Sequence, residues 1–404
     1  MTGLTLARRS AGHHKLRTAL AVAGVAVIGA LNFDMLMLSR GLLLSFADLM
    51  TSVNFDVRVV GGAGFPMSRR SVTGAKKLVE DIRALPEVEE VVMLRAEQAA
   101  VVVPGSRERS ITLVGTTESA ARGTWTLIKG DDLSTSHATG ANDPPVIVSE
   151  RLATMYGLSP GSLLRIRVTP PGSASAMPVF DGQIVGLADF KFESQEEYTV
   201  ATTMEGFRAV SGGDTRDEAD LLLVASKPSV EADRTVAAIA QLRPDLRAYS
   251  NQQVITEFNR TGFTYFRQIS LVLSVTTTSF VVLLVATLLT VSVNQRLGEI
   301  AALRAIGISQ GRIAAMLAWE SALLVGFGGM SALPIGWALA TGLDRILRSL
   351  PGLPQRLHFF VLEPRAIALH FLLLTTTALV AAVYPVWLAV RLPIAATLRR
   401  EVVS

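Results

Sequence analysis

Residues 294–307 read NQRLGEIAALRAIG, and the position of this stretch decides the fold. It is a charged, helix-forming segment with a long apolar run on each side, and it closes with Gly307, a residue type that commonly ends a helix. A polar helix held between two apolar runs is accessible to proteins outside the bilayer. The stretch therefore predicts a membrane protein driven by a partner rather than an enzyme with its own active site.

The composition fits an integral membrane protein that carries a substantial soluble part. Half of the 404 residues are hydrophobic, mean hydropathy is +0.40, and 18% are charged, compared with about 25% in a typical soluble domain. The absence of cysteine excludes disulfides and thiolate metal sites. The net charge of +4 is modest and the basic residues are not interleaved with aromatics, so we predict no nucleic-acid partner.

Four apolar segments are long enough to cross a hydrocarbon core, which takes about 20 residues. They are residues 18–44, 269–293, 313–341 and 366–390. The segment 1–17 carries four basic residues and no acid, which predicts a cytoplasmic N-terminus. Four crossings then place residues 294–312 and the tail 397–404 in the cytoplasm as well, and residues 45–262 outside. The outer loop 343–365 carries four arginines and is the one region that disagrees.

A cleaved signal peptide is the alternative interpretation of residues 1–35. Its charged start fits, but the apolar stretch is too long and no small-x-small cleavage site follows it. We therefore predict a first membrane span.

Residues 45–262 are numerous enough for one or two soluble cores. The two ends of this region show the same strand, helix, strand order, and a further module lies between them. The predicted elements are strands 56–60 and 88–94 around helix 72–85; strand 221–226, helix 230–242 and a strand ending at 250; and, between these, strand 146–148, a helix to 156, and strands 163–168 and 182–185. The predicted fold class is an α-helical membrane protein with four transmembrane helices and a large α+β extracytoplasmic domain between the first two.

The sequence offers no catalytic constellation. It contains no G-x-x-x-x-G-K-[ST] phosphate loop, no H-E-x-x-H metal motif and no G-x-S-x-G elbow, and its five histidines are scattered. We therefore predict no catalytic, cofactor-binding or metal site on this chain.

Two acidic residues fall inside the predicted spans, where a charge costs on the order of 2.5–3.5 kcal/mol. For Glu320 a helix-packing or interfacial role is favoured, with a coupling role as the alternative. For Asp34 we expect a position at the outer interface, with substrate contact as the alternative. Small residues that allow close helix packing recur in the third span at Gly326, Gly329 and Gly336, and Pro334 predicts a kink.

Several ordered motifs resemble one family. They are LRTAL at 16–20, the VIVSE and Gly-Leu, Gly pattern within 143–164, RLGEIAALRAIG at 296–307, Glu320 with the glycines of the third span, and YPVWLAVRLP at 384–393. This set resembles the permease subunits of type VII ABC transporters, which include macrolide exporters, lipoprotein-releasing permeases and FtsX-type cell-division permeases. Length and outer domain resemble the DevC-like subgroup.

The resemblance implies a MacB-like periplasmic core at 45–262 and an FtsX-like permease domain at 263–396, in a bacterial cytoplasmic membrane. It implies that a cytoplasmic ATPase dimer, which holds ATP and Mg, docks on residues 294–312. The implied interface consists of Arg296, Glu299, Ile300, Leu303, Arg304, Ala305, Gly307 and Arg312. A second permease chain would pair with the first, and an identical chain is favoured over a different one. Membrane lipid and a periplasmic adaptor are the further implied partners.

The expected function is to transmit ATP hydrolysis through the membrane and drive export of a lipid, peptide, lipoprotein or hydrophobic compound. The alternative is a signalling permease that activates an extracytoplasmic partner such as a cell-wall hydrolase.

Overall fold

The computed structural model describes residues 15–62, 71–103, 107–117, 122–134, 143–168, 179–211, 216–262, 264–349 and 354–391. The chain divides into two compact units. The helical unit takes its described residues from Met1–Leu42, Thr264–Leu347 and His358–Ser404. The α/β unit takes them from Leu43–Phe263 and Arg348–Leu357.

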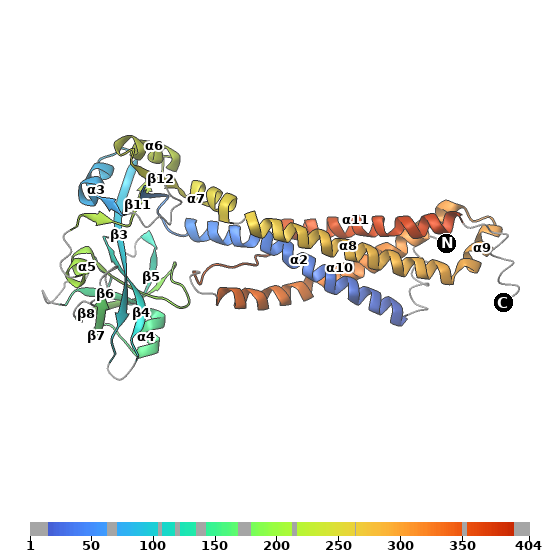
Figure 1. The fold of residues 1–404 in the computed structure, drawn as a ribbon, viewed down its shortest axis with the longest axis horizontal. Coiled ribbons are helices and arrows are strands. Elements are labelled where there is room, and N and C mark those ends of the chain that lie inside the picture. Colours follow the sequence, from blue (N-terminus) through green and yellow to red (C-terminus); the bar gives the residue numbers. More distant parts are fainter. Residues whose placement is uncertain are drawn as a thin grey trace. The chain divides into compact units, whose positions relative to one another are not determined.

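The helical unit is built from long apolar helices that run alongside one another (Figure 1). They are α2 (Lys15–Thr51), α8 (Thr264–Gln295), α10 (Gln310–Arg348) and α11 (Pro364–Arg391), and the short α9 (Leu297–Ala305) follows α8. Each of the four long helices is long and apolar enough to cross a membrane, which confirms the prediction of four such segments. An α-helix satisfies every backbone polar group within one segment, which a hydrocarbon environment requires.

All four long helices contribute to one apolar core. Its buried residues are Ala21 and Val25 from α2, Val281, Val285 and Leu289 from α8, Leu324 and Val325 from α10, and Leu374, Ala378 and Ala381 from α11. Alanine and valine predominate because short side chains let helix backbones approach closely.

A single ten-stranded sheet runs through the α/β unit. Its strands are β1 (Val57–Gly61), β3 (Val88–Val101), β4 (Arg109–Thr116), β5 (Trp125–Gly130), β6 (Pro145–Ser149), β7 (Leu163–Val168), β8 (Phe180–Phe190), β9 (Tyr198–Thr203), β11 (Leu221–Ser226) and β12 (Leu246–Ser250). Nine of them follow the order β12-β1-β11-β3-β4-β9-β6-β8-β5, and β7 pairs with β3 and β8. The short strands β2 (Val72–Thr73) and β10 (Glu218–Ala219) pair separately.

The first and last strands of the unit lie side by side. β1 is hydrogen-bonded to β11 on one side and to β12 on the other, both antiparallel. Helices α3 (Ala75–Arg83) and α6 (Ala232–Leu242) pack their apolar faces on this part of the sheet, where Leu78, Ile82 and Ile239 are buried. The α+β core is therefore closed by segments from its two ends.

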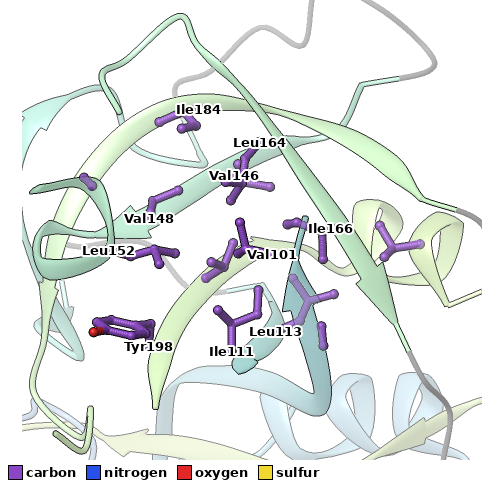
Figure 2. Close-up of a cluster of buried hydrophobic side chains, with 14 of the residues drawn as sticks. Val101, Ile111, Leu113, Val146, Val148, Leu152, Leu164, Ile166, Ile184 and Tyr198 are labelled. Carbon is purple, nitrogen blue, oxygen red and sulfur yellow. The ribbon is translucent and has the colours of Figure 1, made fainter. Parts of the chain in front are cut away.

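The middle of the chain forms the second half of the sheet around its own core (Figure 2). Side chains from β3, β4, β6, β7, β8 and β9, and from the short helix α4 (Glu150–Tyr156), point into a common interior. A second short helix, α5 (Met204–Val210), covers this core with Phe207. β3 is long enough to contribute Val91 to the first core and Val101 to the second, so it joins the two halves.

The ends of the α/β segment are tied together by Asn251. This residue opens α7 (Asn251–Glu257), which continues into a short π-helix (Phe258–Gly262). Its side-chain amide donates to the carbonyls of Met50 at 3.2 Å and Phe55 at 3.0 Å, and its oxygen accepts from buried Arg58. Burial lowers the pKa of Arg58 to about 10, with nearby Asp56 opposing the shift, so the guanidinium stays charged at neutral pH.

The loop between α10 and α11 contributes a strap, residues 354–357, to the α/β unit. The backbone N–H of Gln355 donates to the carbonyl of Glu193 at 3.0 Å, and Ser194 forms an antiparallel β-bridge with Pro354. Leu357 is buried against Leu49, Met50 and Val254. The sequence predicts only an outer loop at 343–365. The strap does not show in local patterns because it is bonded to a segment about 160 residues away in sequence.

We predict that a Ser194→Cys, Pro354→Cys double variant forms a disulfide in the full chain. Residues facing each other in an antiparallel bridge lie about 4.5–5.5 Å apart at Cα, within the range that a disulfide spans. The chain has no cysteine of its own, so a mobility shift on a non-reducing gel after mild oxidation reports this bond alone.

The matched control pairs Pro354→Cys with Lys77→Cys, an exposed residue of α3, and each single variant is run beside it. Cross-linking in the control but not in the Ser194 pair would show that the strap does not occupy this edge.

Candidate coupling site

The short helix α9 has well-defined ends. Arg296 precedes it with φ −121° and ψ 22°, which interrupts the helical path from α8. At the other end Gly307 has φ +92°. Its N–H donates to the Arg304 carbonyl at 3.1 Å and the N–H of Ile308 donates to the Leu303 carbonyl at 3.0 Å. This pair of bonds is a Schellman motif, so the glycine satisfies the last carbonyls and turns the chain into α10.

One side of α9 is fixed to the ends of the long helices. Ile300 is 2% exposed and packs in a cluster that also holds Val293 of α8, Ile313 and Leu317 of α10, and Ala389 of α11. Apolar burial of this kind gives about 25 cal/mol for each Å² removed from water. α9 is therefore anchored to three helices at once, at the end of the bundle where α8 stops and α10 begins (Figure 1).

The other side of α9 is open to a partner. Glu299, Ala302, Ala305 and Gly307 are exposed, and Ile306 is 78% exposed. Glu299, Ala302 and Ile306 recur at helical spacing and share one face. We call Glu299, Ala302, Ala305 and Ile306 the outer face of α9. The outer face therefore presents one charged group, the Glu299 carboxylate in the first turn, and one exposed apolar side chain, Ile306, next to the last turn.

The arginines of the segment differ in their surroundings. Arg304 donates from Nη1 to the carbonyl of Val390 at 3.2 Å, which links α9 to the end of α11. Arg312 is exposed in the first turn of α10, while Arg296 and Leu303 are half-buried. Of the eight residues predicted for an interface, Glu299, Ala305, Gly307 and Arg312 are thus exposed, whereas Ile300 packs inward.

Glu320 connects two of the long helices. Its Oε1 accepts a hydrogen bond of 3.2 Å from the hydroxyl of Ser292, near the end of α8. The next residue, Ser321, donates to the carbonyl of Ala378 in α11 at 2.8 Å. α10 is therefore linked to α8 and α11 by hydrogen bonds at this level.

Side chains of α2 and α11 pack against glycines of α10. A Cβ at Gly329 would lie 2.1 Å from Leu374 of α11, and one at Gly328 would lie 2.5 Å from Val25 of α2. A Cβ at Gly336 would lie 3.1–3.3 Å from Phe33, Ala30 and Asp34. Gly326 has open space beside it, and Pro334 is exposed within an unbroken α10.

Sequence reasoning did not select Ile306, Ser292, Gly328 or His370. Ile306 could have been selected from the sequence, because it lies at helical spacing from the charged Glu299 and therefore away from Ile300. Ser292, Gly328 and His370 had none, because their roles depend on which helix faces them.

The chain thus has four helices that are long and apolar enough to cross a membrane, a large α/β unit after the first, and a short helix with one exposed face between the second and third. A family model of the MacB-like periplasmic core domain matches residues 18–242, and one of the FtsX-like permease C-terminal domain matches residues 271–394. The chain therefore belongs to the MacB- and FtsX-like permeases of type VII ABC transporters.

Two solved structures are similar to the α/β part. The periplasmic region of MacB from Actinobacillus actinomycetemcomitans matches with 13% identity and a TM-score of 0.40, covering 52% of this chain and 96% of that one. The extracellular domain of the ABC-type transporter YknZ from Gram-positive bacteria matches with 10% identity and a TM-score of 0.35, covering 48% and 98%. Among curated proteins none matches the chain.

We predict that Gly307→Ala loosens α9. A side chain at φ +92° costs roughly 1–2 kcal/mol, which corresponds to about 5–30-fold in an opening equilibrium. Amide hydrogen exchange across Leu297–Ala305 should accelerate by that factor. Gly311→Ala is the control, because Gly311 has open space and no positive φ. Equal exchange in both variants would show that the turn does not hold the helix.

Proposed function

We propose that this chain is the permease subunit that couples a separate cytoplasmic ATPase to movement of its own α/β unit. The observation that supports this most directly is α9. It is anchored on one side by Ile300 in contact with α8, α10 and α11, and it leaves the outer face uncovered on the other. A force applied to the outer face would reach three helices without a change in their internal hydrogen bonds.

Transmission to the α/β unit follows from the path of the chain. α2 continues unbroken to Thr51, so its last turns belong to the α/β unit. The strap belongs to the same unit and lies in the segment that connects α10 to α11. Asn251 ties the segment that leads toward α8 to the carbonyl of Met50 near the end of α2. Displacements of the long helices would thus enter the α/β unit through several covalent connections.

The proposal assigns ATP and Mg to the partner ATPase dimer, with no cofactor, catalytic or metal site on this chain. In the described residues no group of three or more His, Asp or Glu side chains is placed to hold a metal ion. The proposed location is a bacterial cytoplasmic membrane, with both termini and α9 on the cytoplasmic side and the α/β unit outside. Two copies of the chain would form the permease pair.

Export is the proposed outcome of this movement, with a lipid, peptide, lipoprotein or other hydrophobic compound handled by the α/β unit and passed to a periplasmic adaptor. Membership of the family supports a transporter role, and the chemical class of the exported compound is proposed. Activation of an extracytoplasmic partner such as a cell-wall hydrolase would use the same movement. The proteins that co-purify with the chain distinguish these outcomes.

The test begins with tagged chain purified from native membranes in mild detergent, followed by identification of bound proteins and measurement of vanadate-sensitive ATP hydrolysis. An Ile306→Glu, Glu299→Lys variant should lose ATPase association by about 30-fold or more, the effect of removing about 2 kcal/mol of contact energy. Ile346→Glu is the control, because Ile346 is also exposed, at 63%, but lies near the other end of α10. An ATPase that stays bound to the double variant would contradict docking on α9.

A further inference from the structure

Asp34 is buried in the middle of the helical unit without a hydrogen-bond partner. The residue is 0% exposed, and neither oxygen of its carboxyl meets a donor from the described residues. It lies on α2 opposite Gly336 of α10, where an added Cβ would come within 3.3 Å of Oδ1. The carboxyl is thus packed between two helices, and its depth in a membrane stays a prediction.

The surroundings of Asp34 are apolar. Phe33 and Met37 beside it on α2 pack with Ala340 of α10 and Ala366 of α11 in one buried cluster. The carboxyl is therefore enclosed by methyl, methylene and ring carbons. The close packing at Gly336 fixes α2 against α10 at the level of the carboxyl itself.

The nearby polar groups are engaged elsewhere. Asn32 donates to Thr278 of α8 at 3.1 Å and accepts from Ser274. His370 of α11 lies 5.2 Å from the Phe33 ring, centroid to centroid, and its Nε2 donates to the Gly329 carbonyl at 3.3 Å. The other ring nitrogen of His370, Nδ1, is buried without a hydrogen-bond partner among the described residues.

The charged groups of the surrounding elements also have partners. Asp344 of α10 accepts from the N–H of Phe359 at 2.7 Å and lies 3.1 Å from His358. Glu363, just before α11, pairs with Arg40 and Arg365. Glu320 of α10 is bonded to Ser292, and α8 has no charged residue between Gln268 and Val293. No cation on these elements is placed to neutralise Asp34 among the described residues.

An ionised carboxylate in such a place would cost several kcal/mol without a compensating charge. A carboxylic acid removes the charge by binding one proton. Since neither oxygen of the Asp34 carboxyl has a donor or an ion-pair partner among the described residues, the neutral acid is the form that this packing admits.

We propose that Asp34 is a proton-binding site inside the helical unit, filled while α2 is packed on α10 at Gly336. When the two helices separate there, water reaches the carboxyl, the O–H bond breaks, the proton passes to water and a carboxylate remains. Re-packing requires a proton to return. The bound ligand is a single proton, and the contact between Gly336 and α2 is the element that retains it. The inference stands independently of ATPase docking.

The first test is infrared spectroscopy of the purified full-length chain in lipid vesicles at pH 7. A free aspartate, with pKa about 3.9, is ionised there. We expect the carbonyl stretch of a protonated carboxylic acid in the wild type and its loss in Asp34→Asn, which keeps the size of the side chain. Glu320→Gln is measured beside it to separate the contribution of the other intramembrane acid. A wild-type spectrum that lacks the Asp34-dependent band overturns the proposal.

The second test separates α2 from α10. Gly336→Leu would insert a side chain where even a Cβ comes within 3.1–3.3 Å of Phe33, Ala30 and Asp34. We expect the acid band to be lost while circular dichroism shows intact helices. Gly326→Leu is the control, since nothing lies within 4 Å of its Cβ position, and it should retain the band. A band that persists in folded Gly336→Leu would show that this contact does not retain the proton.

Discussion

The close contacts of the α10 glycines determine how the helical unit packs. Hydrocarbon gives helices no hydrophobic reason to associate, so contact depends on shape and on a few polar bonds. α2 packs closely against Gly328 and Gly336, and α11 packs closely against Gly329. Ser321 adds its bond to α11, and Glu320 receives one from α8. α10 is thus the helix against which the other three are positioned.

The same packing explains where polar groups of this unit are found. Asn32 is bonded to hydroxyls of α8, His370 through Nε2 to a carbonyl of α10, and Glu320 through Oε1 to Ser292. Asp34 is enclosed at the Gly336 contact with no such partner among the described residues. A helix bundle that is held by short side chains leaves little room for water, so a buried charge without a partner is costly there.

The α/β unit is held by a different kind of constraint, since its sheet is closed by strands from distant parts of the chain. β1 needs β11 and β12 as neighbours, and Asn251 joins the same two ends through carbonyls of Met50 and Phe55. The strap adds a third distant segment through backbone bonds. The two ends of the α/β segment and the strap are therefore tied to this unit by hydrogen bonds as well as by the path of the chain.

The sequence by itself determined the four apolar helices, the strand, helix, strand order at the two ends of the α/β unit, and the charged helix ending at Gly307, because each depends on local composition and periodicity. It predicted no strand at β4, β5 or β9 and no helix at α5. Only the tertiary structure decided which residues face one another. It placed Ile300 inward and left Ile306 exposed, it set Gly328 rather than Gly326 against α2, and it enclosed Asp34. Helical periodicity identifies an apolar face in a soluble protein, but in a nearly all-apolar helix every face is similar. The side that meets another helix is then decided by the shape of the neighbour, which a single segment does not encode.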